Sequence, residues 1–290
     1  MKTRVLTVCA VIFLFCGIVN AGINDGLVAY YPFNGNANDE SGNGHNGIVN
    51  GAILTSDRFG NANNAYSFAG TDDDIDLTGT GSLDFLTGGF SLVAWANFTA
   101  ENPDSSIVTK HYCGVHNSYF IGVNGNSLDF YVDTDPRLKT TEKYNDGKWH
   151  FVVGVYDGTT QYLYVDGLLK LSQARTYSIP NSSNIRIGGV ANGTGDYCIA
   201  LTHFVGAIDD VRIYNRAISA SEVQQLYQGQ STCLGGVVKF TAGTPAKAAE
   251  VNANFDTLNC QIQVLNSQVQ ALQGLKAIVC QDHPTASVCQ

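Results

Sequence analysis

Apolar and polar residues alternate most regularly between Phe204 and Tyr214. A period of two is typical of a β-strand with one buried face. The two predicted faces carry Val205, Ala207, Val211 and Ile213 on one side, and Ile208, Asp210, Arg212 and Tyr214 on the other. Asp209 falls on the predicted buried face, where an unpaired carboxylate costs several kcal/mol of desolvation free energy. The pattern therefore predicts that a metal, a cation or backbone N–H groups meet Asp209.

A short helix is predicted directly after this strand. Ser219 and Glu222 have the spacing of a capping box, in which each residue satisfies a backbone N–H of the other. Val223, Leu226 and Tyr227 then give the first turns one apolar side.

Several further strands follow one another at the spacing of a β-sandwich. Phe90–Phe98 alternates, and the strands 118–123 and 127–132 flank a hairpin turn at 124–126. Asp157-Gly158 and Asp166-Gly167 supply the positive-φ residues that tight hairpins require. With 31 Gly, 14 Tyr, 14 Phe and a single Met, the chain has the composition of a turn-rich β protein. We predict one antiparallel β-sandwich over residues 24–228.

The period changes from two to seven beyond residue 228. Residues 229–244 are predicted to be a linker, and Thr244 and Pro245 suit a helix start. Steps of four and three separate the apolar residues Val251, Phe255, Leu258, Ile262, Leu265, Val269 and Leu272. This spacing predicts a coiled coil over 245–279 and hence a homo-oligomer, either dimer or trimer. The alternative is a helix that folds back onto its own domain.

The first 21 residues resemble a secretory signal peptide. Lys2 and Arg4 precede an apolar run, and Val19-Asn20-Ala21 offers a small residue for cleavage. Cys16 raises a lipoprotein alternative, but bulky Phe15 precedes it. We therefore expect a protein that is secreted or at the cell surface, with the periplasm as another destination.

Charge excludes one large class of partners. Removing residues 1–21 removes two basic and no acidic residues, which leaves 14 basic and 25 acidic residues and a formal charge of −11. A nucleic-acid-binding protein needs a basic surface. We therefore expect no nucleic-acid partner, and beyond residue 21 no apolar run is long enough for a membrane span.

Six cysteines remain beyond residue 21, and an exported chain favours disulfides. Cys113 and Cys198 are the two within the predicted sandwich, so we pair them. Locality along the chain then pairs Cys280 with Cys289, in a tail of residues 280–290, and Cys233 with Cys260. Cys260 lies at an outward heptad position, so a bridge between chains is an alternative.

Oxygen donors crowd the loop from Asn34 to Gly47. Asp39, Asn43, Asn46 and the carbonyls at several glycines are the hard ligands that calcium takes. The alternative is a solvated turn held by Asx hydrogen bonds. A second acidic cluster, at Asp72, Asp73, Asp74 and Asp76, is either another cation site or, in our preferred interpretation, a solvated rim. Similarly, we interpret His150 as a residue of sheet packing rather than of catalysis.

Four motifs resemble LamG-like domains of the concanavalin A-like lectin/glucanase superfamily. They are Y-x-F-x-x-x-A-x-D-x-S-G-N-G-x-x-G from Tyr31, W-H-x-V-V-G-V-Y-D-G from Trp149, L-Y-V-D-G from Leu163, and IDDVRIYNRAIS from Ile208. The resemblance extends from Gly26 to Tyr227. A shorter piece, GTPAKAAEVNANFDTLN, resembles segments near the ends of bacterial and phage fibre-like proteins.

The resemblance implies a jelly-roll sandwich with one structural calcium ion. Asp39 and Asp209 would be its main ligands, with weaker contributions from Asp210 and the carbonyls of Asn43 and His45. The resemblance also implies a glycan or surface glycoconjugate as the partner. For ligand contacts we name Tyr112, His116 and Tyr197, because their loops adjoin the predicted Cys113–Cys198 bridge and offer stacking rings.

No catalytic constellation accompanies the resemblance. Glucanases of this fold align acids along one strand, yet the five glutamates of the chain fall in predicted loops or helices. No E-x-D-x-x-E, G-x-S-x-G or H-E-x-x-H motif occurs. The sequence therefore favours an exported, non-catalytic, lectin-like module. The alternatives are a structural or adhesive component of a bacterial surface or fibre, and, third, a glycoside hydrolase.

Overall fold

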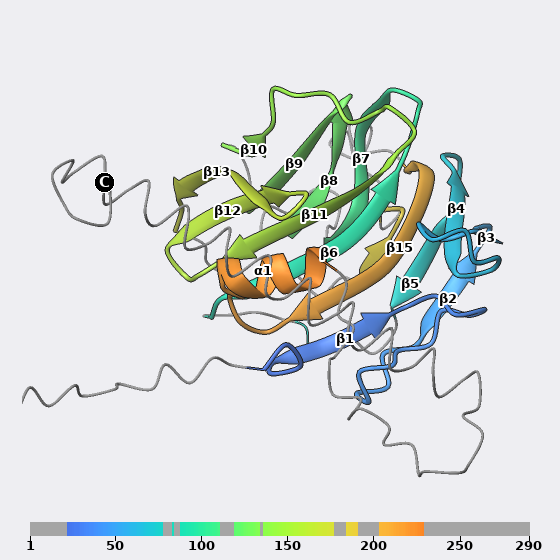
Figure 1. Cartoon of the computed structure of the whole chain (residues 1–290), viewed down its shortest axis with the longest axis horizontal. Coiled ribbons are helices and arrows are strands. Elements are labelled where there is room, and N and C mark those ends of the chain that lie inside the picture. Colours follow the sequence, from blue (N-terminus) through green and yellow to red (C-terminus); the bar gives the residue numbers. More distant parts are fainter. Residues whose placement is uncertain are drawn as a thin grey trace, which may run out of the picture.

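The computed structural model of the chain describes residues 22–77, 83, 88–110, 119–133, 136–176, 184–190 and 203–228. Two antiparallel β-sheets face each other in this part of the chain, and a short helix lies against the outer side of the larger sheet (Figure 1). The predicted antiparallel jelly-roll sandwich is therefore confirmed.

The larger sheet has eight strands. Their order is β13 (Leu168–Ala174), β12 (Thr160–Val165), β11 (Trp149–Tyr156), β6 (Phe90–Asn97), β15 (Val205–Tyr214), β4 (Ala65–Ala69) and β3 (Ile53–Thr55), while β1 (Leu27–Tyr31) also pairs with β15. The predicted hairpin turns join β11 to β12 and β12 to β13. Asp166 at φ 51° and Gly167 at φ 76° adopt the left-handed conformation that the second of these turns requires.

The smaller sheet has seven strands. Their order is β10 (Leu138–Lys139), β9 (Ser127–Val132), β8 (Tyr119–Gly125), β7 (Asn102–Lys110), β14 (Ile185–Ile187), β5 (Asp74–Leu77) and β2 (Gly47–Asn50). Asn124 pairs with Ser127, which confirms the hairpin turn predicted between them. Because β2 and β3 are consecutive in the chain, the chain passes from one sheet to the other at the edge of the sandwich.

Alternate residues of both sheets fill the space between them. Leu128, Phe130 and Val132 of β9 are fully buried in this core, so Asp129 and Tyr131 point to the outer side of the smaller sheet. The sheets approach closely at Gly154 of β11, where an added Cβ would lie 2.2 Å from the ring of Phe130. Glycine at this position makes room for an aromatic ring from the opposite sheet.

A β-bulge in β15 reverses the predicted faces before residue 210 and leaves those after it as predicted. Asp209 pairs with Trp95 and Arg212 with Val93, so two residues of β15 stand opposite Ala94 alone. Asp210 takes φ 52° at this point. Ile208 consequently lies in the core together with Val211 and Ile213, whereas Val205 is 36% exposed. Asp209 points to the outer side of the sheet and is nevertheless only 3% exposed.

Helix α1 (Ala220–Tyr227) begins at the predicted capping box. Ser219 accepts a hydrogen bond from the backbone N–H of Glu222, and the Glu222 side chain accepts one from the backbone N–H of Ser219. The apolar side of α1 packs on the outer face of the larger sheet, where Tyr227 stacks on Trp95 with centroids 5.7 Å apart (Figure 1). The described residues hold no helix long and apolar enough to cross a membrane.

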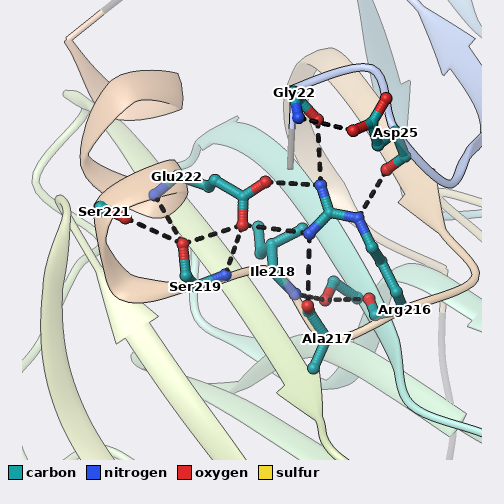
Figure 2. A network of polar contacts seen from close by, with 9 residues as sticks. Gly22, Asp25, Arg216, Ala217, Ile218, Ser219, Ser221 and Glu222 are labelled. Atoms are coloured by element: carbon teal, nitrogen blue, oxygen red, sulfur yellow. Dashed lines mark hydrogen bonds and ion pairs between the residues drawn. The ribbon is translucent and has the colours of Figure 1, made fainter. Parts of the chain in front are cut away.

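Arg216 joins the start of the described chain to this helix. Its guanidinium donates to both carboxylate oxygens of Glu222, at 2.5 and 3.0 Å, and to the carbonyls of Gly22 and Asp25 (Figure 2). The arginine thereby connects β1's leading turn, the end of β15 and the cap of α1 in one network.

In the acidic bend between β4 and β5, Asp72 is exposed, but Asp74 and Asp76 are not part of a solvated rim, which corrects our preferred interpretation for these two residues. Asp74 is only 3% exposed, and Arg186 of β14 forms ion pairs with both Asp74 and Asp76. Asp73 accepts a hydrogen bond from the backbone N–H of Ala69. One arginine from a neighbouring strand therefore pairs with two of the four carboxylates of this bend.

Candidate functional site

Asp39 organises the loop in which a calcium ion was predicted. One carboxylate oxygen accepts hydrogen bonds from the backbone N–H groups of Tyr30 and Ser41, and the other accepts one from His45 at 3.0 Å. Burial alone would raise the pKa of Asp39, but these donors outweigh it and lower the pKa below its ordinary value. Three N–H donors thus occupy the directions from which a cation would approach this carboxylate.

Asn43 and His45 also take part in internal contacts of the loop. The side-chain amide of Asn43 donates to the carbonyl of Val28 at 3.1 Å, which ties the loop to β1. The carbonyl of His45, which the resemblance assigns to the metal, accepts a hydrogen bond from the hydroxyl of Tyr31 at 2.5 Å. These contacts have the pattern of the Asx-bonded turn that the residues alone left open.

Asp209 and Asp210 lie against Arg58. Nη1 of Arg58 is 2.5 Å from Asp209 Oδ2, and Nη2 is 2.9 Å from Asp210 Oδ2. Burial raises the pKa of Asp209 to about 7, and the positive charge of Arg58 opposes that rise. A cation therefore does meet Asp209, as its burial requires, and that cation is an arginine side chain.

The donor set does not fit the calcium ion that the resemblance implies. Calcium takes about six to eight oxygen ligands, whereas the carboxylates of Asp39, Asp209 and Asp210 face N–H donors here. The described residues contain no group of three or more His, Cys, Asp or Glu side chains that could hold a metal ion.

The remaining predicted site residues lie outside the described residues. They are the ligand contacts Tyr112, His116 and Tyr197, and the six cysteines Cys113, Cys198, Cys233, Cys260, Cys280 and Cys289. The two loops that carry the ligand contacts join β7 to β8 and β14 to β15. Their pairing and contacts stay predictions.

A polar cluster on the outer face of the smaller sheet was not predicted. Its members, named here the Asp129 cluster, are Asp104, Asn124, Asp129, Arg137 and Lys139. Nη1 of Arg137 bonds to Asp104 Oδ1 at 2.5 Å and to Asp129 Oδ2 at 3.0 Å. Asn124 donates to Asp104 at 3.2 Å and accepts from Lys139 at 2.7 Å. Four neighbouring strands and the segment before β10 therefore contribute to one network.

Burial increases toward the middle of the Asp129 cluster. Lys139 is exposed, the side chains of Arg137 and Asp104 are 25% and 19% exposed, and that of Asp129 is fully buried. Burial raises the pKa of Asp129 to about 7, although Arg137 opposes this rise. Asp129 Oδ1 has no hydrogen-bond partner among the described residues. A buried acceptor without a donor costs free energy that a ligand hydroxyl would recover.

Aromatic rings adjoin the cluster. Phe120 and Tyr131 stack with centroids 4.9 Å apart and an interplanar angle of 15°. The guanidinium of Arg137 lies 4.8 Å from the centroid of the Tyr131 ring. Gly122 makes room for this arrangement, because a Cβ there would lie 2.4 Å from the Phe120 ring. The cluster therefore combines hydrogen-bond donors and acceptors, while the aromatic pair beside it is itself buried, with Phe120 0% and Tyr131 5% exposed.

One signal for this site was present in the sequence. Asp129 interrupts the apolar segment Leu128–Val132, and the alternation of that strand already points Asp129 away from the core. Arg137 gave no such signal, because it lies in an irregular segment before the two-residue strand β10. Only strand pairing shows that Arg137 lies near Asp129, since Leu138 is paired with Phe130.

His150 has a polar environment at the start of β11. Its Nδ1 is 2.9 Å from Asp166 Oδ2, its Nε2 is 3.1 Å from Asp146 Oδ1, and the ring of Tyr144 packs edge-on against it. The hydrogen bond with Asp166 raises the pKa of His150 most, and Asp146 raises it further. His150 thus connects two turns rather than packing only against the sheet.

The comparison with protein families supports the same fold assignment. Residues 69–224, more than half of the chain, match the model of the concanavalin A-like lectin/glucanases superfamily. The chain belongs to this superfamily. Human laminin subunit alpha-3 is a relative, 33% identical over 135 residues, which cover 43% of this chain and 4% of laminin. This superfamily member therefore spans a small fraction of the length of that relative.

Solved structures with the same fold include two toxin binding domains and one domain of an arabinanase. The binding domain of Paraclostridial Mosquitocidal Protein 1 has a TM-score of 0.57 and 16% identity, covering 78% of this chain and 57% of that chain. Domain 4 of the arabinanase AbnA from Geobacillus stearothermophilus, in complex with arabinotriose, has a TM-score of 0.53 and 20% identity, covering 69% and 98%. The receptor binding domain of botulinum neurotoxin D has a TM-score of 0.54 and 18% identity, covering 78% and 57%.

Proposed function

We propose that this superfamily member is a non-catalytic module that binds neutral glycans at the Asp129 cluster. The observation that carries the proposal is the buried, unpartnered Oδ1 of Asp129 at the base of a network whose rim is exposed. Sugar hydroxyls donate and accept hydrogen bonds, so they match a site that presents a carboxylate, a guanidinium and an amide together.

The charge of the cluster favours a neutral ligand. Asp104 and Asp129 are balanced by Arg137 and Lys139, so the site offers neither an anion nor a cation a large net attraction. The similarity to an arabinotriose-bound domain and to receptor-binding domains supports glycan binding without specifying the sugar.

A glycan array probed with the full chain tests this function. We expect binding to neutral oligosaccharides and a loss of affinity of at least about tenfold in Asp129→Ala and Arg137→Gln, since each removes a hydrogen bond to a charged group. Lys170→Gln is the matched control, because Lys170 lies on β13 of the larger sheet and pairs with Glu142 outside the cluster, so its change should leave binding intact. Silence across the array would favour the structural or adhesive alternative.

One observation makes hydrolysis the second candidate. Asp104 and Asp129 both bond to the same Nη1 of Arg137, so their carboxylates approach the separation of about 5 Å that retaining glycosidases use. Arg137, however, occupies the space between them that a glycosidic oxygen would need. We therefore expect the protein to release no reducing ends from any glycan that it binds. If the wild type releases reducing ends and Asp129→Asn does not, a purely binding role is contradicted.

Export and self-association complete the proposal. A secretory leader over residues 1–21 would bring the module to surface glycans, and a coiled coil over 245–279 would multiply weak sites into avidity. Light scattering of the full chain and of a chain that ends at residue 228 tests the second point. We expect the full chain to be an oligomer and the shortened chain to be a monomer. A full chain that is monomeric would contradict self-association.

A further inference from the structure

Two adjacent carboxylates on β15 share one guanidinium. Arg58 bonds to Oδ2 of Asp209 at 2.5 Å and to Oδ2 of Asp210 at 2.9 Å, and the three side chains are 14%, 4% and 9% exposed. Neighbouring residues of a regular strand point to opposite faces. Here the β-bulge and the φ of 52° at Asp210 let both carboxylates reach the same cation. The bulge and the arginine therefore act together.

The turn that carries Arg58 is built to hold it in place. Asp57 accepts hydrogen bonds from the backbone N–H groups of Phe59 and Asn61 and from the side chain of Asn61. The guanidinium of Arg58 also lies 4.5 Å from the ring centroid of Phe59 and 4.8 Å from that of Trp95. Aromatic rings stabilise a guanidinium more readily than a hydrated ammonium. The turn and the two aromatic rings thus hold Arg58 beside the two carboxylates.

The second arginine of this region completes the charge balance. Nη2 of Arg212 is 3.0 Å from Asp210 Oδ1, and its guanidinium lies over the ring of Tyr30 at 4.3 Å. Two carboxylates are therefore matched by two guanidinium groups in a buried setting. A divalent ion at this place would have to displace Arg58 and leave that arginine buried without its partners, which is strongly unfavourable.

We infer that Arg58 is the built-in counter-ion of the Asp209–Asp210 pair, so that β15 is held in the sandwich without a bound divalent cation at this position. The inference is independent of glycan binding, because the Asp129 cluster lies on the outer face of the other sheet. It assigns to one side chain the role that a calcium ion was expected to have.

Thermal unfolding of the full chain at about pH 8, where carboxylates are ionised, tests the inference. We expect the melting temperature of the wild type to stay within about 1 °C between excess chelator and millimolar calcium, since a ligand that binds only the folded state would raise it. Arg58→Ala should lower the melting temperature by roughly 10 °C, because it leaves two buried carboxylates with one guanidinium.

Two further variants make the outcome decisive. Arg58→Lys keeps the charge but loses the second hydrogen bond, so its melting temperature should lie below that of the wild type, which tests the inference even if Arg58→Ala fails to fold. Lys148→Gln is the control, because it removes a cation from an exposed ion pair with Asp146. Its melting temperature should equal that of the wild type. A rise in the melting temperature of the wild type on adding calcium would overturn the inference. So would an Arg58→Ala variant that is as stable as the wild type.

Discussion

The guanidinium of Arg216 and the carboxylate of Glu222 form a two-pronged ion pair at the start of α1 (Figure 2). The same carboxylate accepts the backbone N–H of Ser219 at 2.7 Å, so one glutamate serves both the helix cap and the ion pair. Its side chain is 7% exposed and that of Arg216 is 23% exposed. The pair therefore couples the helix to β15 in a poorly solvated setting.

Removing Arg216 should destabilise the sandwich. We expect Arg216→Ala to lower the free energy of unfolding by about 3 kcal/mol, since it leaves a mostly buried carboxylate without its cation. Urea unfolding measured by circular dichroism checks the value. Lys148→Gln, at an exposed ion pair, provides the control and should change stability by under about 1 kcal/mol. A loss no larger than the control's would show that the capping box alone stabilises Glu222.

The sheet-to-sheet contact at Gly154 gives a packing prediction. Gly154→Ala would place a methyl group against the Phe130 ring in a fully buried contact, and we expect a loss of about 3 kcal/mol of stability. Gly88→Ala is the control, because nothing lies within 4 Å of a Cβ there. Equal unfolding midpoints for the two variants would contradict the close approach of β11 to β9.

His150 should make stability depend on pH. Its pKa is raised in the folded state, chiefly by the hydrogen bond with Asp166, so its contribution is complete below the ordinary pKa and is lost as pH rises through the folded value. Asp146, Lys148 and Tyr144 are the other titratable groups beside it. We expect Asp166→Asn, which keeps an acceptor for the Phe151 N–H, to cost more stability at about pH 6 than at about pH 9.

Asp129 should also make stability depend on pH, in a lower pH interval than His150 does. Its pKa is raised from 3.8 to about 7 by burial, so its favourable contribution is complete below its ordinary pKa and declines as pH rises toward 7. Asp129→Asn should therefore gain stability relative to the wild type between about pH 5 and pH 8. Asp39→Asn is the contrasting control: the pKa of Asp39 is lowered, so its contribution is lost only as pH falls below the ordinary value. Parallel profiles for the Asp129 variant and the wild type would contradict the burial of that carboxylate.

Local patterns in the sequence predicted several of the strands and turns. Alternation indicated β6 and β15, and the Asp-Gly and Asn-Gly dipeptides indicated the hairpin turns β8–β9, β11–β12 and β12–β13, because positive φ confines such turns to a few residue types. The Ser219–Glu222 capping box was likewise readable, since a cap depends on residues three apart. These features rest on interactions between neighbours along the chain.

The partners of the charged residues were decided by tertiary structure alone. Arg58 and Asp209 are 151 residues apart, and Arg186 and Asp74 are 112 apart, so no local pattern could pair them. The bulge at Asp210 also reversed the predicted faces of β15 from Val205 to Asp209, because one extra residue shifts the alternation, while Val211 and Ile213 lie in the core as predicted. Asp209 could be recognised in the sequence as a carboxylate that needs a cation. Which cation it received depended on where the sandwich brought the turn that carries Arg58.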